Sequence, residues 1–328
     1  MSLILVIEQI LNGVQLGVML FLMAAGLTLI FGVMGLINLA HGSLYMVGAF
    51  AAAAVAGGTG SFLLGLVAAL AAAAAAVAGV TGSFLLGLVA ALAAAAAAGA
   101  LIEVTVIRRL YAADHLDQVL ATFALILVFS EGVRWVFGSF PLYLDIPAAL
   151  SGPVTLPGGI EYPLYRLVLI GIGLAVGLGL WWLIERTRLG IRIRAGENDR
   201  EMIAALGVDI SRLYTLVFAL GAALAGLAGA LVGAIQSVQV GMGEPVLILA
   251  FVVIVIGGIG SIRGAFVGAL LVGLTETLGG VFLPAFFGLF TDPSTATSIG
   301  ASLASMAIYV LMGVVLVWRP TGLFGVRA

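Results

Sequence analysis

Long apolar runs separated by short polar stretches dominate this chain, and they predict membrane-spanning helices. A helix needs about 20 mostly apolar residues to cross the hydrocarbon core of a bilayer. We expect spans near residues 12–36, 62–80, 84–107, 118–137, 165–184, 213–236, 246–262, 265–283 and 301–318. The stretch 38–56 is apolar but short, so it is either one more span or a broken or re-entrant helix. The pattern predicts one all-α polytopic membrane domain over residues 1–328 with about 8 to 10 transmembrane helices.

Composition supports the same class of protein. The chain has 328 residues, of which 63% are hydrophobic and 9% are charged, whereas an average soluble domain has about 25% charged residues. So few charges cannot cover a water-exposed surface, which excludes soluble enzymes and nucleic-acid-binding proteins. With no Cys and only two His, we predict no disulfide and no metal site. No Ser-His-Asp set or carboxylate pair suggests a catalytic residue.

The basic residues are all arginine, and their placement predicts the orientation of the chain. Because the chain has no Lys, the ATP-binding pattern G-x-x-x-x-G-K-[ST] cannot occur in it. Arg134 and Arg166 flank a Pro- and Gly-rich loop at 138–164, and we expect this loop outside the cell. The other 11 of the 13 arginines fall in the loops of the opposite face and in the C-terminal tail. The positive-inside rule therefore predicts a cytoplasmic C-terminus.

A tandem repeat interrupts the regular alternation of spans. Residues 55–76 recur as residues 77–98 and differ only at Gly58 and Val80. Each unit is about long enough to cross a bilayer, so one extra copy inverts the preceding chain unless it forms a half-inserted element or a hairpin. We favour slippage in repetitive coding sequence or an assembly error, and a functional repeat remains the alternative.

One long polar loop, residues 185–212, holds six of the arginines. Asn198 or Asp199 is expected to cap a short helix in this loop, and Gly207 is expected to end it. Ala204 and Ala205, with the following leucine, would give this helix an apolar face. Such a helix suits docking of a soluble partner. The alternative is a solvated loop that simply follows the positive-inside rule.

Four segments resemble the permease subunits of branched-chain amino acid ABC importers, in particular the shorter of the two paired permeases. They are AAGLTLIFGVMGLINLAHGSLYMVGAF at 24–50, RAGENDREMIAALGVDISRLY at 194–214, IGGIGSIRGAFVGALLVGLTETL at 256–278 and RPTGLFG at 319–325. The resemblance implies that the 194–207 segment couples the chain to an ATPase. The coupling residues expected from it are Arg194, Ala195, Gly196, Glu197, Asp199, Ala204, Ala205 and Gly207.

The same resemblance implies partners, localisation and substrate. It implies a second homologous permease, two nucleotide-binding ATPase subunits that hold ATP and Mg²⁺, and an extracytoplasmic solute-binding protein. This chain would bind no cofactor and would lie in a bacterial or archaeal inner membrane. The expected substrates are leucine, isoleucine and valine, while urea or another amino acid or amide stays open within the family. A different class, an ion-gradient-driven secondary transporter or channel, is the alternative function.

Polar residues and glycines that interrupt apolar runs are candidates for the translocation path, because polar groups in a membrane face protein or water. The first set is Asn38, His41, Gly42 and Ser43, and the second is Gly257, Gly258, Gly260 and Ser261. Glu276 lies in the middle of a span and is a candidate by its cost in lipid. The alternatives are a helix cap for His41 and close helix packing for the glycines.

Small residues and acids at other positions have simpler expected roles. A ridge of small residues four apart is expected to pack against another helix, and it consists of Gly221, Ala225, Gly229 and Gly233. Glu8, Glu103 and Glu131 lie near span edges, and we expect their carboxylates to reach the membrane interface.

Overall fold

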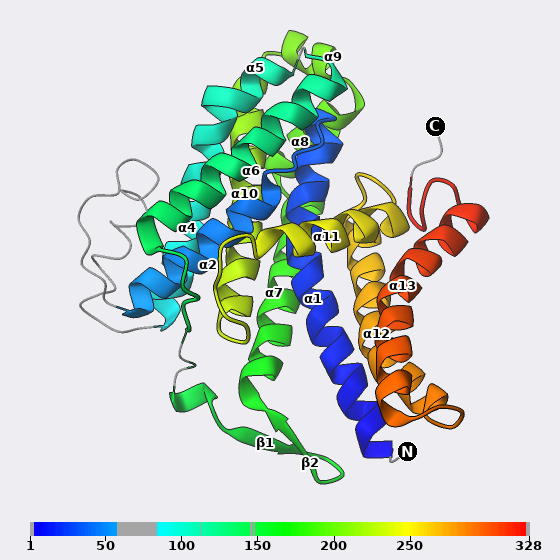
Figure 1. Ribbon diagram of the computed structural model, residues 1–328. Helices are drawn as coiled ribbons and strands as arrows, with labels where there is room; N and C mark the ends of the chain where they lie inside the picture. Colours follow the sequence, from blue (N-terminus) through cyan, green and yellow to red (C-terminus); the bar gives the residue numbers. More distant parts are fainter. Residues whose placement is uncertain (1–2, 58–83, 112, 145, 147, 326–328) are drawn as a thin grey trace. The chain divides into compact units, whose positions relative to one another are not determined.

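Helices dominate the computed structural model, which describes residues 3–57, 84–111, 113–144, 146 and 148–325 (Figure 1). A helix bonds its own backbone N–H and C=O groups, so it can cross a medium that offers them no water. The repeat at 55–76 and 77–98 and the expected span at 62–80 lie largely or wholly outside the described residues.

The elements follow one another along the chain with short connections. They are α1 (Leu3–Met34), α2 (His41–Gly57), α4 (Phe84–Ile102), a π-helical turn η1 (Glu103–Ile107), α5 (Arg108–Leu110), α6 (His115–Phe137), a 3₁₀ turn η2 (Ala148–Leu150), β1 (Pro153–Leu156), β2 (Ile160–Pro163), α7 (Leu164–Arg186), α8 (Arg188–Asn198), α9 (Arg200–Ala205), α10 (Ile210–Gly233), α11 (Gly243–Gly257), α12 (Ile262–Phe287) and α13 (Pro293–Trp318).

Seven helices in the described part of the chain are long and apolar enough to span a membrane. They are Ile4–Met34, Leu88–Leu110, His115–Phe137, Leu164–Arg186, Ile210–Gly233, Ile262–Phe287 and Pro293–Trp318. The expected span at 246–262 is wrong in its length, because α11 has only 15 residues and ends at Gly257. The stretch at 38–56 forms α2, a helix of 17 residues. The all-α polytopic class is confirmed.

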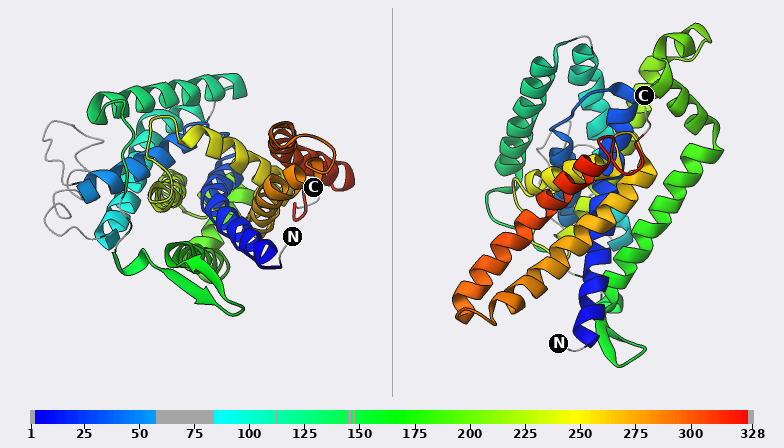
Figure 2. Two further views of the ribbon diagram at one scale, coloured as in Figure 1. Left: turned by 60° about the horizontal axis from the view of Figure 1, so that its bottom comes forward. Right: turned by 90° about the vertical axis from the view of Figure 1, so that its right-hand side faces the viewer.

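The chain divides into two compact units, and each contains parts of α1, α7 and α11. Unit 1 comprises residues 1–24, 148–177 and 249–328, and unit 2 comprises residues 25–147 and 178–248. In unit 1, α12 and α13 pack side by side, as the orange and red helices of Figure 2 show. Their approach is close because Gly300 of α13 lies against the ring of Pro284 in α12.

Among the described residues, one β-hairpin forms a two-stranded sheet. Strands β1 and β2 pair antiparallel, with Val154 opposite Tyr162 and Thr155 opposite Glu161. The first pair faces inward and the second is exposed, as the period of two in a strand requires. The hairpin is fixed to α1 because the Tyr162 hydroxyl donates a hydrogen bond to Asn12 Oδ1 at 3.0 Å.

Unit 2 is built around α10, which packs against α2 and α4. The backbone of α10 at Gly226 lies directly against Gly48 of α2 and the methyl group of Ala95 in α4. One turn further on, Gly229 lies against the carbonyl group of Tyr45. Two apolar helices gain no hydrophobic free energy by associating in lipid, so close van der Waals contact between small residues holds them together.

We predict that Gly229→Ala destabilises the protein, because the new methyl group would overlap the backbone of α2. The expected cost is about 1–3 kcal/mol, typical of an overpacked core. The matched control is Gly132→Ala in α6, where a methyl group meets no atom within 4 Å. Thermal unfolding in detergent measures both variants. Equal melting temperatures for the two variants would contradict this packing.

Helix α13 begins with a well-formed cap. Asp292 is the N-cap residue, and its Oδ2 accepts hydrogen bonds from Thr295 N–H at 3.0 Å and from the Ser294 hydroxyl at 2.5 Å. These bonds favour the ionised carboxyl group and lower the pKa of Asp292 from 3.8 to about 2. Pro293 follows at the first helical position, where the missing N–H costs nothing.

A lowered pKa in the folded state means that the Asp292 carboxylate stabilises the fold above its ordinary pKa, and that this contribution is lost as the pH falls through about 2. We therefore expect Asp292→Asn to lower the melting temperature at neutral pH, with the difference from wild type shrinking below about pH 4. Asp114→Asn is the control, because Asp114 caps α6 without a side-chain hydrogen bond. The prediction would be contradicted if the difference in melting temperature between wild type and Asp292→Asn did not change with pH.

Candidate functional site

The polar loop at 185–212 forms two helices, α8 and α9, that meet at Asp199. Asp199 is the N-cap of α9, and its Oδ1 accepts hydrogen bonds from the N–H groups of Glu201 and Met202, both at 3.0 Å. The break between the helices therefore follows from a side chain that replaces the helical hydrogen bonds.

Gly207 ends α9 in the left-handed conformation, with φ at +86°. Gly207 N–H bonds to Ala204 O at 3.0 Å, and Val208 N–H bonds to Ile203 O at 3.3 Å. These two bonds form a Schellman motif, which needs a residue that tolerates positive φ after the helix. Both ends of α9 are thus fixed where the sequence pattern placed them.

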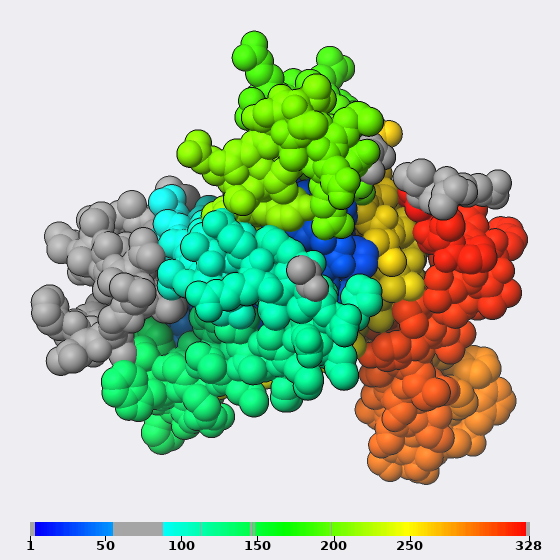
Figure 3. Space-filling model, turned by 90° about the horizontal axis from the view of Figure 1, so that it is seen from above, coloured from blue at the N-terminus to red at the C-terminus, as the bar shows by residue number. Residues whose placement is uncertain are grey.

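Apolar side chains on α9 face solvent. Met202 is 63% exposed and Leu206 is 77% exposed, while Ile203 between them is 6% exposed and anchors the helix. Ala204 and Ala205 are exposed as well. We call Met202, Ala204, Ala205 and Leu206 the α9 surface, and Figure 3 shows this segment in yellow-green on the face seen from above. An exposed apolar group of residues on a charged loop is typical of a protein interface.

The predicted coupling residues of α8 lie differently from those of α9. Arg194 Nη1 donates to the carbonyl oxygen of Ile184 at 2.5 Å and lies 3.3 Å from Glu185 Oε2. It therefore satisfies a backbone carbonyl at the end of α7. Gly196 is buried, and a Cβ at this position would lie 3.4 Å from Leu213 Cδ2 of α10. Ala195 is half-buried, and Glu197 is exposed.

The first candidate set for the translocation path is buried in unit 2. Asn38 has no exposed surface, and its Oδ1 accepts a hydrogen bond from Ala40 N–H at 3.1 Å. This turn leads into α2, whose first residue, His41, is also fully buried. Gly42 lies against the backbone of Gly243 at the start of α11. Ser43 is likewise buried.

The second candidate set lies at the turn between α11 and α12 in unit 1. The chain reverses there with positive φ at Gly258 and Gly260, and Ser261 caps α12 by accepting a hydrogen bond from Gly264 N–H at 3.0 Å. Gly257 contacts the backbone of Gly264. Close backbone packing therefore accounts for part of this glycine pattern.

The C-terminal segment 319–325 covers the same turn. The N–H groups of Leu323 and Phe324 donate to Ile256 O and Gly257 O, each at 2.9 Å. These are carbonyl groups at the end of α11 that have no partner within the helix. A Cβ at position 322 would lie only 2.5 Å from the backbone of Gly258, so only glycine fits there. The RPTGLFG motif thus acts as a backbone cap for α11.

We predict that Gly322→Ala loosens this cap. Its φ of +81° is unfavourable for alanine, and the methyl group would overlap Gly258. The combined cost is about 2 kcal/mol or more. Gly313→Ala on α13, where nothing lies within 4 Å, is the control. A drop in melting temperature of about 3 °C or more for the first variant alone is expected, and an unchanged value would contradict the contact.

Two remaining predictions concern helix interiors. Glu276 lies in α12 and is half-buried, and its Oε2 has no hydrogen-bond partner within the described residues. The small residues of α10 all lie inside unit 2, where Gly221 faces the backbone of Gly26, and Gly233 faces Val238. The members of this ridge are Gly221, Ala225, Gly229 and Gly233.

The expectation that Glu103 reaches the membrane interface is wrong, because its side chain has no exposed surface. The sequence held one weak sign of this burial, namely an arginine, Arg108, five residues after Glu103. The sign is weak because ion pairs within a regular α-helix have a spacing of three or four residues. The π-helical turn η1 brings the two side chains together. A pattern based on a regular α-helix could not find this pair.

The seven long apolar helices define a multi-pass membrane protein. Among the described residues, no group of three or more His, Asp or Glu side chains could hold a metal ion. Over residues 9–318 the sequence matches the profile of a family described as the permease component of a branched-chain amino acid transport system. The chain belongs to this family and is a transport permease subunit, which confirms the resemblance.

Curated relatives cover almost the full chain. The high-affinity branched-chain amino acid transport system permease protein BraD of Pseudomonas aeruginosa is 29% identical over 97% of this chain and 95% of its own length. LivH of Escherichia coli, strain K12, has the same identity and coverage. The fructose import permease protein FrcC of Rhizobium meliloti is 36% identical but over only 29% of this chain. No solved structure matches.

Proposed function

We propose that this chain is the membrane permease of an ATP-binding cassette importer and that the α9 surface docks on a nucleotide-binding subunit. The observation that carries the proposal is the exposure of Met202 in α9 and of Leu206 at its C-cap, on a helix that is capped at both ends. Exposed apolar side chains on an arginine-rich loop have no lipid to cover them, so a partner protein is the natural cover.

The proposed cargo is a branched-chain amino acid, namely leucine, isoleucine or valine, delivered by an extracytoplasmic binding protein. Relatives that match over nearly the full chain are named for this transport. Urea or another amino acid or amide is the alternative cargo. The fructose permease shares too little of the chain to favour a sugar.

The energy would come from partner subunits. Because this chain has no Lys, it cannot form a P-loop of the G-x-x-x-x-G-K-[ST] type. We therefore assign ATP and Mg²⁺ to two nucleotide-binding subunits, and the second half of the pathway to a homologous permease. This chain itself would be non-catalytic and would bind no cofactor.

The orientation follows from the arginines. With the α8–α9 loop in the cytoplasm, the C-terminal tail lies on the same side, and the β-hairpin between Arg134 and Arg166 faces outward. The corresponding membrane is the bacterial or archaeal inner membrane. ATP binding would bring the two nucleotide-binding subunits together, displace α8 and α9, and change which side of the membrane the pathway opens to.

The test is co-purification with the candidate ATPase subunits, followed by ATP-dependent uptake in proteoliposomes. We expect Met202→Glu with Leu206→Glu to weaken association by about tenfold or more. The reason is that two apolar side chains that the docked partner would bury would become charged. The control is Leu289→Glu with Phe290→Glu, two apolar residues of similar exposure between α12 and α13. We expect this control to associate normally.

Two outcomes would oppose the proposal. Normal association of the Met202→Glu, Leu206→Glu variant would mean that the α9 surface is not the docking site. A wild-type chain that purifies alone and carries solute down an ion gradient without ATP would instead be a secondary transporter. In that case Glu276, the half-buried carboxylate of α12, becomes the residue to pursue.

A further inference from the structure

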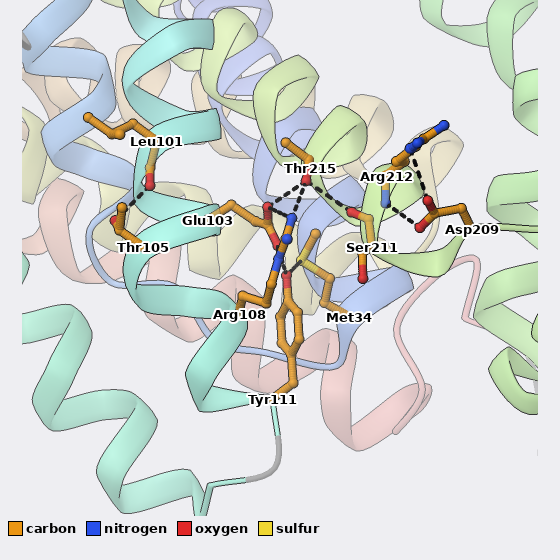
Figure 4. Close-up of polar contacts among 10 residues, drawn as sticks. All are labelled: Met34, Leu101, Glu103, Thr105, Arg108, Tyr111, Asp209, Ser211, Arg212 and Thr215. Carbon is orange, nitrogen blue, oxygen red and sulfur yellow. Dashed lines mark hydrogen bonds and ion pairs between the residues drawn. The ribbon is translucent and has the colours of Figure 1, made fainter.

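A buried carboxylate lies where α4 passes into the π-helical turn η1. The Glu103 side chain is 0% exposed, and an isolated carboxylate at such a site would cost several kcal/mol. It is stable there only if hydrogen-bond donors surround it. Figure 4 shows that side chains from separate parts of unit 2 supply these donors.

Two of the donors come from the chain that follows η1. Arg108 binds the carboxylate with two nitrogens, Nε at 3.2 Å from Oε1 and Nη2 at 3.0 Å from Oε2. The Tyr111 hydroxyl donates to Oε1 at 2.8 Å. Burial and this hydrogen bond both raise the pKa of Tyr111, so its hydroxyl remains a donor at neutral pH.

The third donor comes from α10. The Thr215 hydroxyl lies 2.6 Å from Glu103 Oε2 and 2.9 Å from Ser211 O. Its single hydrogen favours the shorter bond to the charged oxygen. Arg108 Nη2 in turn donates to Thr215 Oγ1 at 2.8 Å. Glu103, Arg108 and Thr215 therefore form a closed triangle between the end of α4 and the beginning of α10.

The rings of Tyr111 and Tyr214 extend this junction. Their centroids are 5.1 Å apart and their planes meet at 82°, an edge-to-face contact. Tyr214 is buried in α10, next to Thr215 in sequence. The polar triangle and the ring pair together join the same two helix ends.

The junction lies close in sequence to α9. Only residues 206–209 separate α9 from α10, and this short connection is hydrogen-bonded to both helices. Val208 is bonded back to Ile203, while Asp209 caps α10 by accepting a hydrogen bond from Arg212 N–H at 3.1 Å. A displacement of α9 would therefore be passed to the first turns of α10.

We propose that Glu103 is a positioning residue that makes α4 move together with α10 when the α9 surface is displaced. The inference rests on the proposed docking of an ATPase at α9. Without the carboxylate, mainly apolar packing would join α4 to α10. The end of α4 would then follow α10 less closely, and each ATP hydrolysed would produce a smaller change in the pathway. Glu103 contacts neither solute nor nucleotide in this assignment.

The experiment uses the assembled complex in proteoliposomes. It measures the uptake of leucine, isoleucine and valine together with ATP hydrolysis in the same sample. We expect Glu103→Gln and Thr215→Val each to lower the solute imported per ATP by about fivefold or more, while ATPase activity stays within about twofold of wild type. Thr215→Ser keeps the hydroxyl and is expected to restore the ratio. The control is Glu131→Gln, which breaks the exposed Glu131–Arg134 pair of α6.

The outcomes separate this inference from the proposed function. A wild-type complex that forms but shows no ATP-dependent uptake overturns the proposed function. If wild type shows such uptake but Thr215→Val retains the wild-type ratio, only the role of the Glu103 junction is overturned. A parallel loss of uptake and ATPase activity in Thr215→Val, restored by Thr215→Ser, also overturns it, because the junction would then serve assembly. If Glu103→Gln does not fold, the two Thr215 variants decide.

Discussion

Close backbone contact between small residues is the constraint on which unit 2 depends. In lipid the association of apolar helices brings no hydrophobic gain, so α10 must approach α2 and α4 closely enough for dispersion forces to hold them. Gly226 and Gly229 make this possible, because a side chain at Gly226 would overlap the methyl group of Ala95 and one at Gly229 would overlap the backbone of α2 at Tyr45. The same constraint explains why α10 is continuously buried over residues 221–231.

Such packing leaves few places for charge, and several of the charged groups lie at helix ends. Arg194 returns to the end of α7, Asp199 and Asp292 cap helices, and Glu103 joins two helix ends through three donors. Each polar group thereby satisfies backbone groups or another charge. Helix ends bonded in this way suit the proposed transfer of a displacement from the polar loop into the membrane helices.

Much of the candidate site could be predicted from local sequence. Asp199 and Gly207 mark the two ends of α9 because capping depends on residues within one turn of each end. The burial of Glu103 could not be predicted in this way. Its ion pair with Arg108 depends on a π-helical turn, and its contact with Thr215 joins segments far apart in the chain. The cap of α11 by segment 319–325 is equally non-local.

The sequence by itself determined the all-α membrane class, most of the spans and the bounds of α9, because hydrophobic length and capping are properties of neighbouring residues. Only the tertiary structure decided which residues of the polar loop face outward. It buried Ile203 and exposed Met202, and it enclosed Glu103 among donors from other elements. Burial depends on what packs against each side chain, and those neighbours come from segments far apart in the chain.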